Sequence, residues 1–250
     1  MRIDLYLTPG QIDELQLRDK NVVVVDVLRA GTSIATALSN GAREIIPVET
    51  VEAAVKLSGS LFGDVVLLGG ERGGKIIEGF HLGNSPSEYV EKTVKGKSIV
   101  FTTTNGAFAM AKGRYAKRMV IAAFVNVGRV VDFIKEVQEN FVFICAGNQW
   151  SVGGFSLEDT ACAGMIIHRL QKSGSKNVEL SDSAVSALTL YQSFGRNLAK
   201  MIENSESGKR TAELGYKGDL KICAAVDSIP VLPNLRGNVI RLAQEPTMKG

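Results

Sequence analysis

The sequence predicts an α/β protein in which a mainly parallel or mixed sheet lies between helical layers. Apolar segments of strand length alternate with segments of helical periodicity from residue 20 to about residue 170. Four consecutive valines at 22–25 indicate a central strand that is buried on both faces. From residue 182 to residue 204 the apolar residues follow helical spacing, so the C-terminal third is predicted to be mostly helical. This alternation favours βα units with right-handed crossovers.

Each expected element follows from a local pattern in the chain. Apolar runs rich in β-branched residues predict strands at residues 3–7, 22–25, 44–48, 65–68, 98–101, 119–122 and 141–145. Helical periodicity predicts helices at residues 32–40, 51–57, 87–94, 107–112, 127–139 and 156–170, and a short extended segment is expected at 239–242. No low-complexity linker divides the chain, so we expect a single domain over residues 1–250. Its weakest point is the loop at 172–177.

The composition excludes several classes of protein. A hydrophobic share of 45% and a charged share of 22% are ordinary for a soluble α/β protein with an ample core. The net charge of +3 is too small to predict nucleic-acid binding, and no apolar run is long enough to span a bilayer. The N-terminal segment lacks the apolar region of a signal peptide. The sequence leaves open whether the chain forms a homo-oligomer.

The three cysteines, Cys145, Cys162 and Cys223, are odd in number and widely spaced. They have neither zinc-site spacing nor the pattern of a disulfide framework, which favours a reducing cytoplasm. Each is expected to be a small buried hydrophobe rather than a nucleophile.

The segment 21–36 carries the first candidate site. Its strand ends in a carboxylate, Asp26, where an apolar residue would be expected, and Arg29 follows three positions later, just before a helix. Ligands of open α/β sheets bind beside the carboxyl ends of the strands, so this pair suits a phosphate and a divalent cation. The alternative is a helix cap with a surface ion pair.

A second candidate site follows the strand predicted at 98–101. Thr102, Thr103, Thr104, Asn105 and Gly106 offer three hydroxyls, an amide and a flexible backbone at a helix start. A phosphate or sulfonate needs several donors at close approach, and this set provides them. The alternative is a Thr-rich strand end with an Asn-Gly turn.

A long glycine-rich segment, 69–86, provides another acid and base. Loops of this length in compact domains are commonly functional, and here Glu71 and Arg72 precede two glycines. The alternative is a glycine hinge with a solvated ion pair. His81, in the same segment, is interpreted as a polar loop residue in preference to a general acid.

Two further carboxylates, Glu158 and Asp159, occupy the first turn of a helix that Ser156 caps. They serve either a cation or the helix dipole alone. If the sheet is parallel, these residues lie along the same edge as the other three segments. Clustered oxygen ligands without a His/Cys set favour Mg²⁺. No P-loop, dinucleotide fingerprint or Gly-x-Ser-x-Gly elbow is present.

Six segments spread along the chain carry a resemblance to a known family. They are VVVDVLRAGTSI, GERGG, GFHLGNSP, TTTNG, CAGNQWSVGGFSLEDTACAG and GYKGDLKICAAVD. Together, from residue 3 to about residue 240, they resemble the 2-phosphosulfolactate phosphatase family of coenzyme M biosynthesis. The resemblance implies a single three-layer α/β/α domain and an Mg²⁺-dependent acid phosphatase that converts 2-phosphosulfolactate to sulfolactate and inorganic phosphate. Two positions depart from the family: His81 stands where Asp is expected, and Gly31 where a hydroxyl residue is more usual.

Residues and resemblance together predict a cytoplasmic Mg²⁺-dependent phosphatase that acts on a small anionic phosphate monoester. The predicted catalytic residues are Asp26, Arg29, Glu71 and Arg72. The predicted substrate-binding residues are Thr102, Thr103, Thr104, Asn105 and Gly106, and the predicted metal ligands are Asp26, Glu71, Glu158 and Asp159. Either water attacks the phosphorus directly or Asp26 forms an acyl-phosphate. The alternatives are an isomerase or transferase of phosphorylated metabolites, or a non-catalytic anion-binding protein, which would not concentrate carboxylates around its ligand.

The cationic and hydroxyl groups at the proposed edge exceed what one phosphate needs. They include Arg29, Arg72, Lys75 and the hydroxyls at 102–104. We therefore expect a second anion on the substrate, such as a sulfonate or a carboxylate, beside the phosphate.

Overall fold

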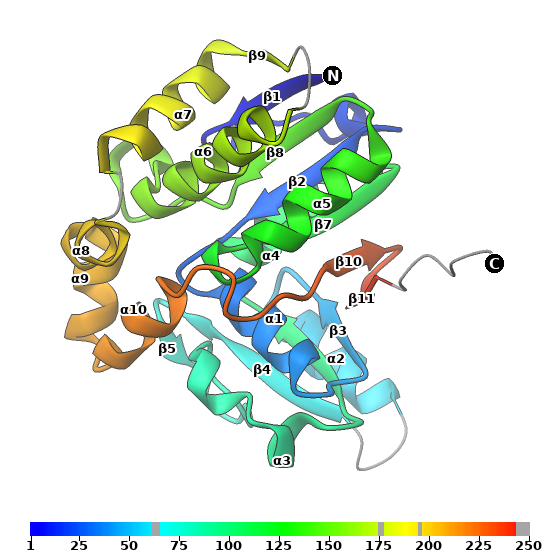
Figure 1. Cartoon of the computed structure of the whole chain (residues 1–250). Coiled ribbons are helices and arrows are strands. Elements are labelled where there is room, and N and C mark those ends of the chain that lie inside the picture. Colours follow the sequence, from blue (N-terminus) through cyan, green and yellow to red (C-terminus); the bar gives the residue numbers. More distant parts are fainter. Residues whose placement is uncertain (62–65, 175–177, 195–196, 244–250) are drawn as a thin grey trace.

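The computed structural model describes residues 1–61, 66–174, 178–194 and 197–243, and over these residues the chain forms a mixed sheet with helices on both faces (Figure 1). The strands are β1 Arg2–Tyr6, β2 Asn21–Val25, β3 Glu44–Pro47, β4 Val66–Arg72, β5 Lys75–Ile76, β6 Ser98–Thr102, β7 Arg118–Ala122, β8 Phe141–Cys145, β9 Glu179–Leu180, β10 Pro233–Arg236 and β11 Val239–Leu242. The helices are α1 Ala30–Ser39, α2 Val51–Ser60, α3 Glu91–Val94, α4 Gly106–Lys112, α5 Val127–Val137, α6 Leu157–Lys172, α7 Asp182–Phe194, α8 Leu198–Asn204, α9 Glu206–Glu213 and α10 Lys217–Cys223. Short 3₁₀ turns lie at Glu14–Leu17, Pro86–Glu88, Phe124–Asn126 and Val152–Gly154.

The sheet contains two groups of parallel strands. Its order is β5-β4-β6-β3-β11-β10-β7-β2-β8-β1-β9. In the first strand group, β7, β2, β8, β1 and β9 are parallel, and in the second strand group, β4, β6 and β3 are parallel. The hairpin β10–β11 lies between them and pairs antiparallel to both β7 and β3. Three successive antiparallel pairings therefore separate the groups, so the two groups run in opposite senses along the sheet.

This topology confirms the α/β class with a mixed sheet, but the expectation that all four candidate segments lie along one edge is wrong. The hairpin inserts between β3 and β7, and the sequence predicted only its second strand, at 239–242. Residues 44–112 of the second strand group come between β2 and β7 in the chain. The carboxyl ends of the two groups consequently reach the candidate site from different sides.

The valine run of β2 lies at the centre of the molecule, and all four valines are fully buried. Val23 and Val25 pack in a cluster with residues of α5 and α6, whereas Val22 and Val24 pack in a second cluster with residues of α1. Side chains of a strand alternate between its two faces, so β2 joins the two helical layers.

The C-terminal third is mostly helical, as expected. Figure 1 shows α8, α9 and α10 beside β5, at the end of the molecule toward which β2 points. The helix expected at 87–94 is instead a 3₁₀ turn and the four-residue α3, because Tyr89 between them is buried and donates its hydroxyl to the carbonyl of Gly83 at 2.6 Å. Residue 65 of the strand expected at 65–68 and residues 175–177 of the loop expected at 172–177 lie outside the described residues. None of the described helices is long and apolar enough to cross a bilayer.

Candidate active site

The carboxyl ends of the two strand groups meet at one place, and direct contacts join them there. Nη2 of Arg29, after β2, donates to the carbonyl of Gly74, after β4, at 2.8 Å. The backbone N–H of Gln149, after β8, donates to Oδ1 of Asn105, after β6, at 3.3 Å. The candidate segments are therefore brought together by convergence of two sheet edges.

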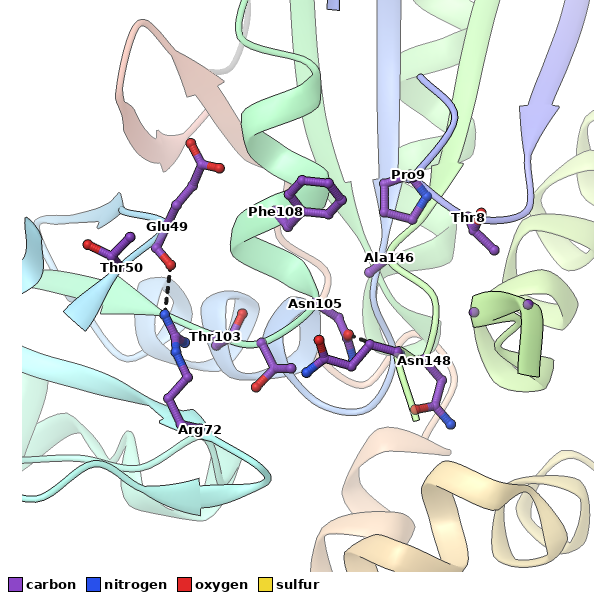
Figure 2. Close-up of a pocket in the computed structure, with 15 residues that line it drawn as sticks. Thr8, Pro9, Glu49, Thr50, Arg72, Thr103, Asn105, Phe108, Ala146 and Asn148 are labelled. Carbon is purple, nitrogen blue, oxygen red and sulfur yellow. Dashed lines mark hydrogen bonds between the residues drawn. The ribbon is translucent and has the colours of Figure 1, made fainter. Parts of the chain in front are cut away.

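A cavity of about 640 Å³ opens at this meeting point, and we call it the main cavity. Figure 2 shows Arg72 and Thr103 on one side of it and Asn148 on the other. A smaller hollow of about 60 Å³, the crevice, shares Thr104, Asn105 and Asn148 with the main cavity. The crevice is also bordered by Leu28, Arg29, Glu71, Gly74, Asn84, Trp150, Ser207, Arg210, Thr211 and Leu214.

Asp26 is buried beneath the turn that follows β6. Its Oδ1 accepts a hydrogen bond from the N–H of Ala30 at 3.0 Å, so it caps α1. Its Oδ2 faces Gly106, where an added Cβ would lie only 2.5 Å away. Burial is the largest cause that raises the pKa of Asp26 to about 7, and the negative charges of Glu71 and Glu158 raise it further against the lowering effect of the Ala30 hydrogen bond. Asp26 thus combines the helix cap of the alternative interpretation with a carboxylate oxygen that is left for chemistry.

Gly31 is required by the same turn. An added Cβ would lie 2.3 Å from the carbonyl oxygen of Asp26, whose acceptance of the Gly31 N–H closes the first turn of α1. The close approach explains why glycine, and no hydroxyl residue, occupies this position in this chain.

Asp159 joins the loops after β2 and β8. Its Oδ1 accepts from the N–H of Val27 at 2.8 Å and its Oδ2 from the N–H of Gly147 at 3.0 Å. Burial first, and then the charges of Asp26 and Glu158, raise its pKa well above the ordinary value. Ser156 caps α6 through the N–H of Asp159 at 3.2 Å, as the sequence predicted, but the Asp159 carboxylate points to the strand loops and does not complete a capping box.

Glu71 has both carboxylate oxygens engaged by its own strand group. Oε1 accepts from the N–H of Thr104 at 2.7 Å, and Oε2 accepts from the N–H of Gly74 at 2.6 Å and from the hydroxyl of Thr104 at 3.0 Å. Glu158 is the opposite case, because it is 2% exposed and its Oε2 has no hydrogen-bond partner among the described residues.

The four carboxylates differ in how well they fit a cation. In the described part of the chain, no three or more His, Cys, Asp or Glu side chains are arranged as a ready metal site. Mg²⁺ commonly takes only one or two protein carboxylates and completes its shell with waters and substrate phosphate. The unpaired oxygen of Glu158 and the Oδ2 of Asp26 suit such an open site, whereas Glu71 and Asp159 each hold two or more chain donors.

Arg29 is buried and held from three directions. Nη1 pairs with Asp219 Oδ2 at 2.8 Å, Nη2 donates to Gly74 O, and the guanidinium lies 4.1 Å from the ring centroid of Tyr216. Asp219 also accepts from the hydroxyl of Ser85 at 2.7 Å. The ion pair of the alternative interpretation therefore exists, but it is buried and its carboxylate comes from α10. Sequence reasoning did not single out Asp219, because its only signal was its place in the segment GYKGDLKICAAVD.

The guanidinium of Arg72 donates its hydrogen bonds to other groups of the protein. Nη1 donates to Glu71 O, and Nη2 donates to Glu49 O at 2.7 Å and Thr102 Oγ1 at 2.8 Å. Figure 2 shows this side chain directed toward Glu49 at the rim of the main cavity. Lys75 is exposed on β5. The surplus cations expected from the sequence are thus largely committed or turned to solvent.

The hydroxyls of 102–104 are also engaged. Thr102 accepts from Arg72, Thr103 accepts from the N–H of Ala107 at 3.1 Å, and Thr104 donates to Glu71. In Figure 2 the side chain of Asn105 lies between the two sides of the main cavity, near Asn148.

Two residues that sequence reasoning missed border the crevice with unpaired buried atoms. They are Asn84, through Oδ1, and Arg210, through Nε. Together with Glu158, they carry the three unpaired buried polar side-chain atoms of the described residues. Asn84 lies in the glycine-rich segment already marked as functional, whereas Arg210 lies on α9, whose sequence has no distinguishing signal.

Other expectations concern residues outside the site. His81 is exposed, and its Nδ1 accepts from the N–H of Leu68 at 3.0 Å, as expected of a polar loop residue. All three cysteines are buried and unpaired. Burial raises the pKa of Cys145 and Cys162 well above the ordinary value and that of Cys223 to about 12, which keeps them protonated and unreactive.

Comparison with known proteins gives a consistent set of relatives. A family model described as 2-phosphosulpholactate phosphatase matches residues 6–238. A protein of Caldanaerobacter subterraneus subsp. tengcongensis, named probable 2-phosphosulfolactate phosphatase, is 40% identical over 245 residues, which cover 98% of this chain and 100% of that protein. Proteins with the same name from Clostridium acetobutylicum and Thermotoga maritima are each 37% identical, over 93% and 91% of this chain and 97% and 94% of theirs.

Proposed function

The chain belongs to the 2-phosphosulfolactate phosphatase family, and we propose that it is an Mg²⁺-dependent phosphatase that hydrolyses 2-phosphosulfolactate to sulfolactate and inorganic phosphate. The observation that carries the proposal is that Asp26 turns Oδ2 toward Gly106 of segment 102–106, which we propose binds the substrate, and lies close enough to Glu158, with its unpaired Oε2, for the two charges to interact. A receptor that only bound anions would gain nothing from buried carboxylates beside its ligand, because like charges repel.

In this proposal Asp26 and Glu158 hold the cation. When bound, Mg²⁺ neutralises charge on the phosphoryl oxygens and orients them. Asp26 Oδ1 is fixed by the N–H of Ala30, so only Oδ2 faces the reacting group. In the protein alone, burial and the charges of Glu71 and Glu158 raise the pKa of Asp26 to about 7, and a bound cation would offset this repulsion.

The remaining predicted residues position the site. Asp159 ties the loops after β2 and β8 together, and Glu71 ties Thr104 to the turn at Gly74. Arg29 borders the crevice with its guanidinium held by Asp219 and by the carbonyl of Gly74, and Asn105 offers an amide at the main cavity. Preorganised groups of this kind stabilise charge that develops in phosphoryl transfer.

We also propose that the enzyme acts in the cytoplasm. The support is that all three cysteines are buried and unpaired, which suits a reducing compartment.

The test is release of inorganic phosphate from a panel of phosphate monoesters, with Mg²⁺ and with EDTA. We expect release from 2-phosphosulfolactate with Mg²⁺, loss of release with EDTA, and recovery when Mg²⁺ or Mn²⁺ is added in excess. Full activity after exhaustive chelation would refute the metal requirement. Conversion of a phosphorylated compound without release of phosphate would instead favour an isomerase or transferase.

The same assay separates the two routes of attack when it is run with enzyme in excess in ¹⁸O-labelled water. Direct attack places the label in phosphate during the first turnover. An acyl-phosphate on Asp26 that water opens at the acyl carbon places the label in the Asp26 carboxylate instead, which mass spectrometry of the digested protein detects. Because water attack at the phosphorus of an acyl-phosphate also labels phosphate, the digest of acid-quenched enzyme is searched for phosphorylated Asp26 as well.

A further inference from the structure

We propose that Arg210, held against Trp150, binds a second anionic group of the substrate, a carboxylate or sulfonate on its carbon skeleton, and so gives the enzyme its preference for multiply charged monoesters. This inference rests on the proposed phosphatase function. The sequence suggested Arg29, Arg72, Lys75 and the hydroxyls at 102–104 for this second anion, and the inference assigns it to Arg210 in the crevice under α9.

The charge balance of the crevice singles out Arg210. Arg29 also borders it, but its charge is neutralised by Asp219 at 2.8 Å. Glu71 borders it too, with both oxygens turned to chain donors. Arg210 has no carboxylate partner in the described part of the chain, and its one hydrogen bond there runs from Nη2 to Gly73 O at 3.2 Å. Of the two arginines that border the crevice, Arg210 is therefore the one without a carboxylate partner among the described residues, although the Glu71 carboxylate borders the same crevice.

The shape of the arginine site suits an anion. The guanidinium carbon of Arg210 lies 4.3 Å from the ring centroid of Trp150, a stacked arrangement that fixes the plane of the guanidinium. A guanidinium fixed in this way presents its edge N–H groups as a fork, which matches the oxygens of a carboxylate or sulfonate. Its Nε is buried and unpaired, and buried donors are rarely left without an acceptor in a finished site.

A second unpaired group supports the same assignment. Asn84 is 5% exposed, borders the crevice, and has its side-chain Oδ1 buried without a partner. The two ends of an amide differ only in which atom is N and which is O, so the rotated amide would place N–H donors where the unpaired oxygen now lies. Asn84 and Arg210 come from distant parts of the chain, both border one hollow, and each carries a buried polar atom without a partner.

Size and position fit one substituent of a small substrate. The crevice has about 60 Å³, room for one small charged group and not for a whole phosphate ester. It shares Thr104 and Asn105 with the main cavity, so a substrate held by segment 102–106 can extend a substituent toward Arg210. The alternative is that Arg210 only ties α9 to the turn at Gly73.

The experiment compares substrates that differ in this substituent. Values of kcat/KM are measured on 2-phosphosulfolactate, on 2-phospholactate and on isopropyl phosphate, whose alcohol portion is neutral. Arg210→Met removes the charge, Arg210→Lys keeps the charge without the fork, and Lys209→Met removes a neighbouring exposed charge on α9 as the matched control.

We expect Arg210→Met to lower kcat/KM by about tenfold or more on the two charged substrates, the loss of at least one charge-assisted hydrogen bond, and by less than about threefold on isopropyl phosphate. Arg210→Lys should recover part of the loss, and Lys209→Met should resemble the wild type. Equal losses on charged and neutral substrates would show a structural role and overturn the inference. No loss on the charged substrates would overturn it as well.

A binding measurement separates this inference from the proposed function. Trp150 is the sole tryptophan of the chain, so its fluorescence reports occupancy of the crevice. Sulfolactate, which has no phosphate, should give a saturable change with wild type and with Lys209→Met, and bind at least about tenfold more weakly to Arg210→Met. If the wild type releases no phosphate from any ester but this pattern holds, the second-anion site stands and the phosphatase function fails. Equal affinity in Arg210→Met, or no saturable change in the wild type, would refute the site itself.

Discussion

The two strand groups bring carboxylates of opposite character to the junction of their carboxyl ends, where Asp26 faces Gly106 and Glu71 borders the crevice. The first strand group supplies Asp26, whose Oδ2 faces Gly106, and the first turn of α6 adds Glu158, whose Oε2 has no partner among the described residues. The second strand group supplies Glu71, whose two oxygens accept three hydrogen bonds from Thr104 and Gly74. The comparison indicates a division of labour between the two strand groups. The first group carries the carboxylates proposed to bind the cation, and the second group uses Glu71 to hold segment 102–106 in place.

This difference has an energetic consequence. Burial disfavours the charged form of Asp26 and of Asp159, and repulsion from neighbouring carboxylates disfavours it further. Both effects raise the pKa of these two residues. Removal of one such charge should therefore relieve strain on the fold. Removal of the Glu71 charge should instead leave backbone donors without acceptors, which costs stability.

The largest effect is expected for Asp26→Asn. Catalysis should fall by roughly 10³-fold or more, because the change removes a metal ligand or proton-handling group. Asn can still accept from the N–H of Ala30, so the cap of α1 is kept and the melting temperature should hold or rise. Asp132→Asn, at an exposed position on α5, is the control. Normal turnover by Asp26→Asn would remove this residue from both roles.

Second in size is the effect of Asp219→Asn on stability. The change leaves Arg29 charged and buried without a counter-ion, which typically costs about 3 kcal/mol or more. Denaturant unfolding measures the loss. A matched exposed pair is Lys95 with Glu91, where Glu91→Gln should change little. An Asp219→Asn protein as stable as the wild type would mean that the buried pair orients Arg29 without contributing to the free energy of unfolding.

Glu71→Gln should show an intermediate effect, and it tests the comparison most directly. A glutamine would direct an N–H group at a backbone N–H of Thr104 or Gly74, so one donor loses its acceptor at a cost of about 1–3 kcal/mol. Both activity and the free energy of unfolding should fall, in contrast to Asp26→Asn. If Glu71→Gln lost activity while gaining stability, Glu71 would belong with the reactive carboxylates and the division of labour would be wrong.

The sequence predicted those parts of the fold and site that depend on local pattern. The β2 valines, the cap at Ser156 and the carboxylate at the end of β2 follow from neighbouring residues, and all are where they were expected. The pairing of Arg29 with Asp219, and the hairpin β10–β11 within the sheet, join residues far apart in the chain. No periodicity records such contacts, so sequence reasoning placed four segments at one edge where the structure joins two.

Arg210 illustrates the same limit at the site. Its neighbours on α9 carry no pattern typical of a site, and the approach of α9 to the turn after β4 places it at the crevice. Asn84 was easier to anticipate, because a long glycine-rich segment already indicated function.

The smallest effect concerns the seam between the strand groups, where Glu44 of β3 accepts from Arg241 of β11 at 2.6 Å and from Ser98 of β6 at 2.6 Å. Burial acts to raise the pKa of Glu44, but the hydrogen bonds from Ser98 and Arg241, with the charges of Arg241 and Arg43, hold it below the ordinary value. A carboxyl whose pKa is lower in the folded state stabilises the protein above its unfolded pKa, and this contribution is lost as the pH falls through the folded pKa.

Glu44→Gln should therefore reduce the free energy of unfolding by about 0.5–1 kcal/mol at neutral pH, since the Arg241 side chain is 66% exposed and its pairing is partly screened. The difference from wild type should shrink in acid, where Glu44 is protonated in both states.

We propose that residues 1–250 form one domain, and the same unfolding experiment tests this. If the hairpin unites the strand groups, Glu44→Gln shifts a single unfolding transition followed by circular dichroism and by Trp150 fluorescence. Two separate transitions would show that the groups unfold independently, and a difference from wild type that is the same at every pH would show that the Glu44 charge makes no contribution at the seam.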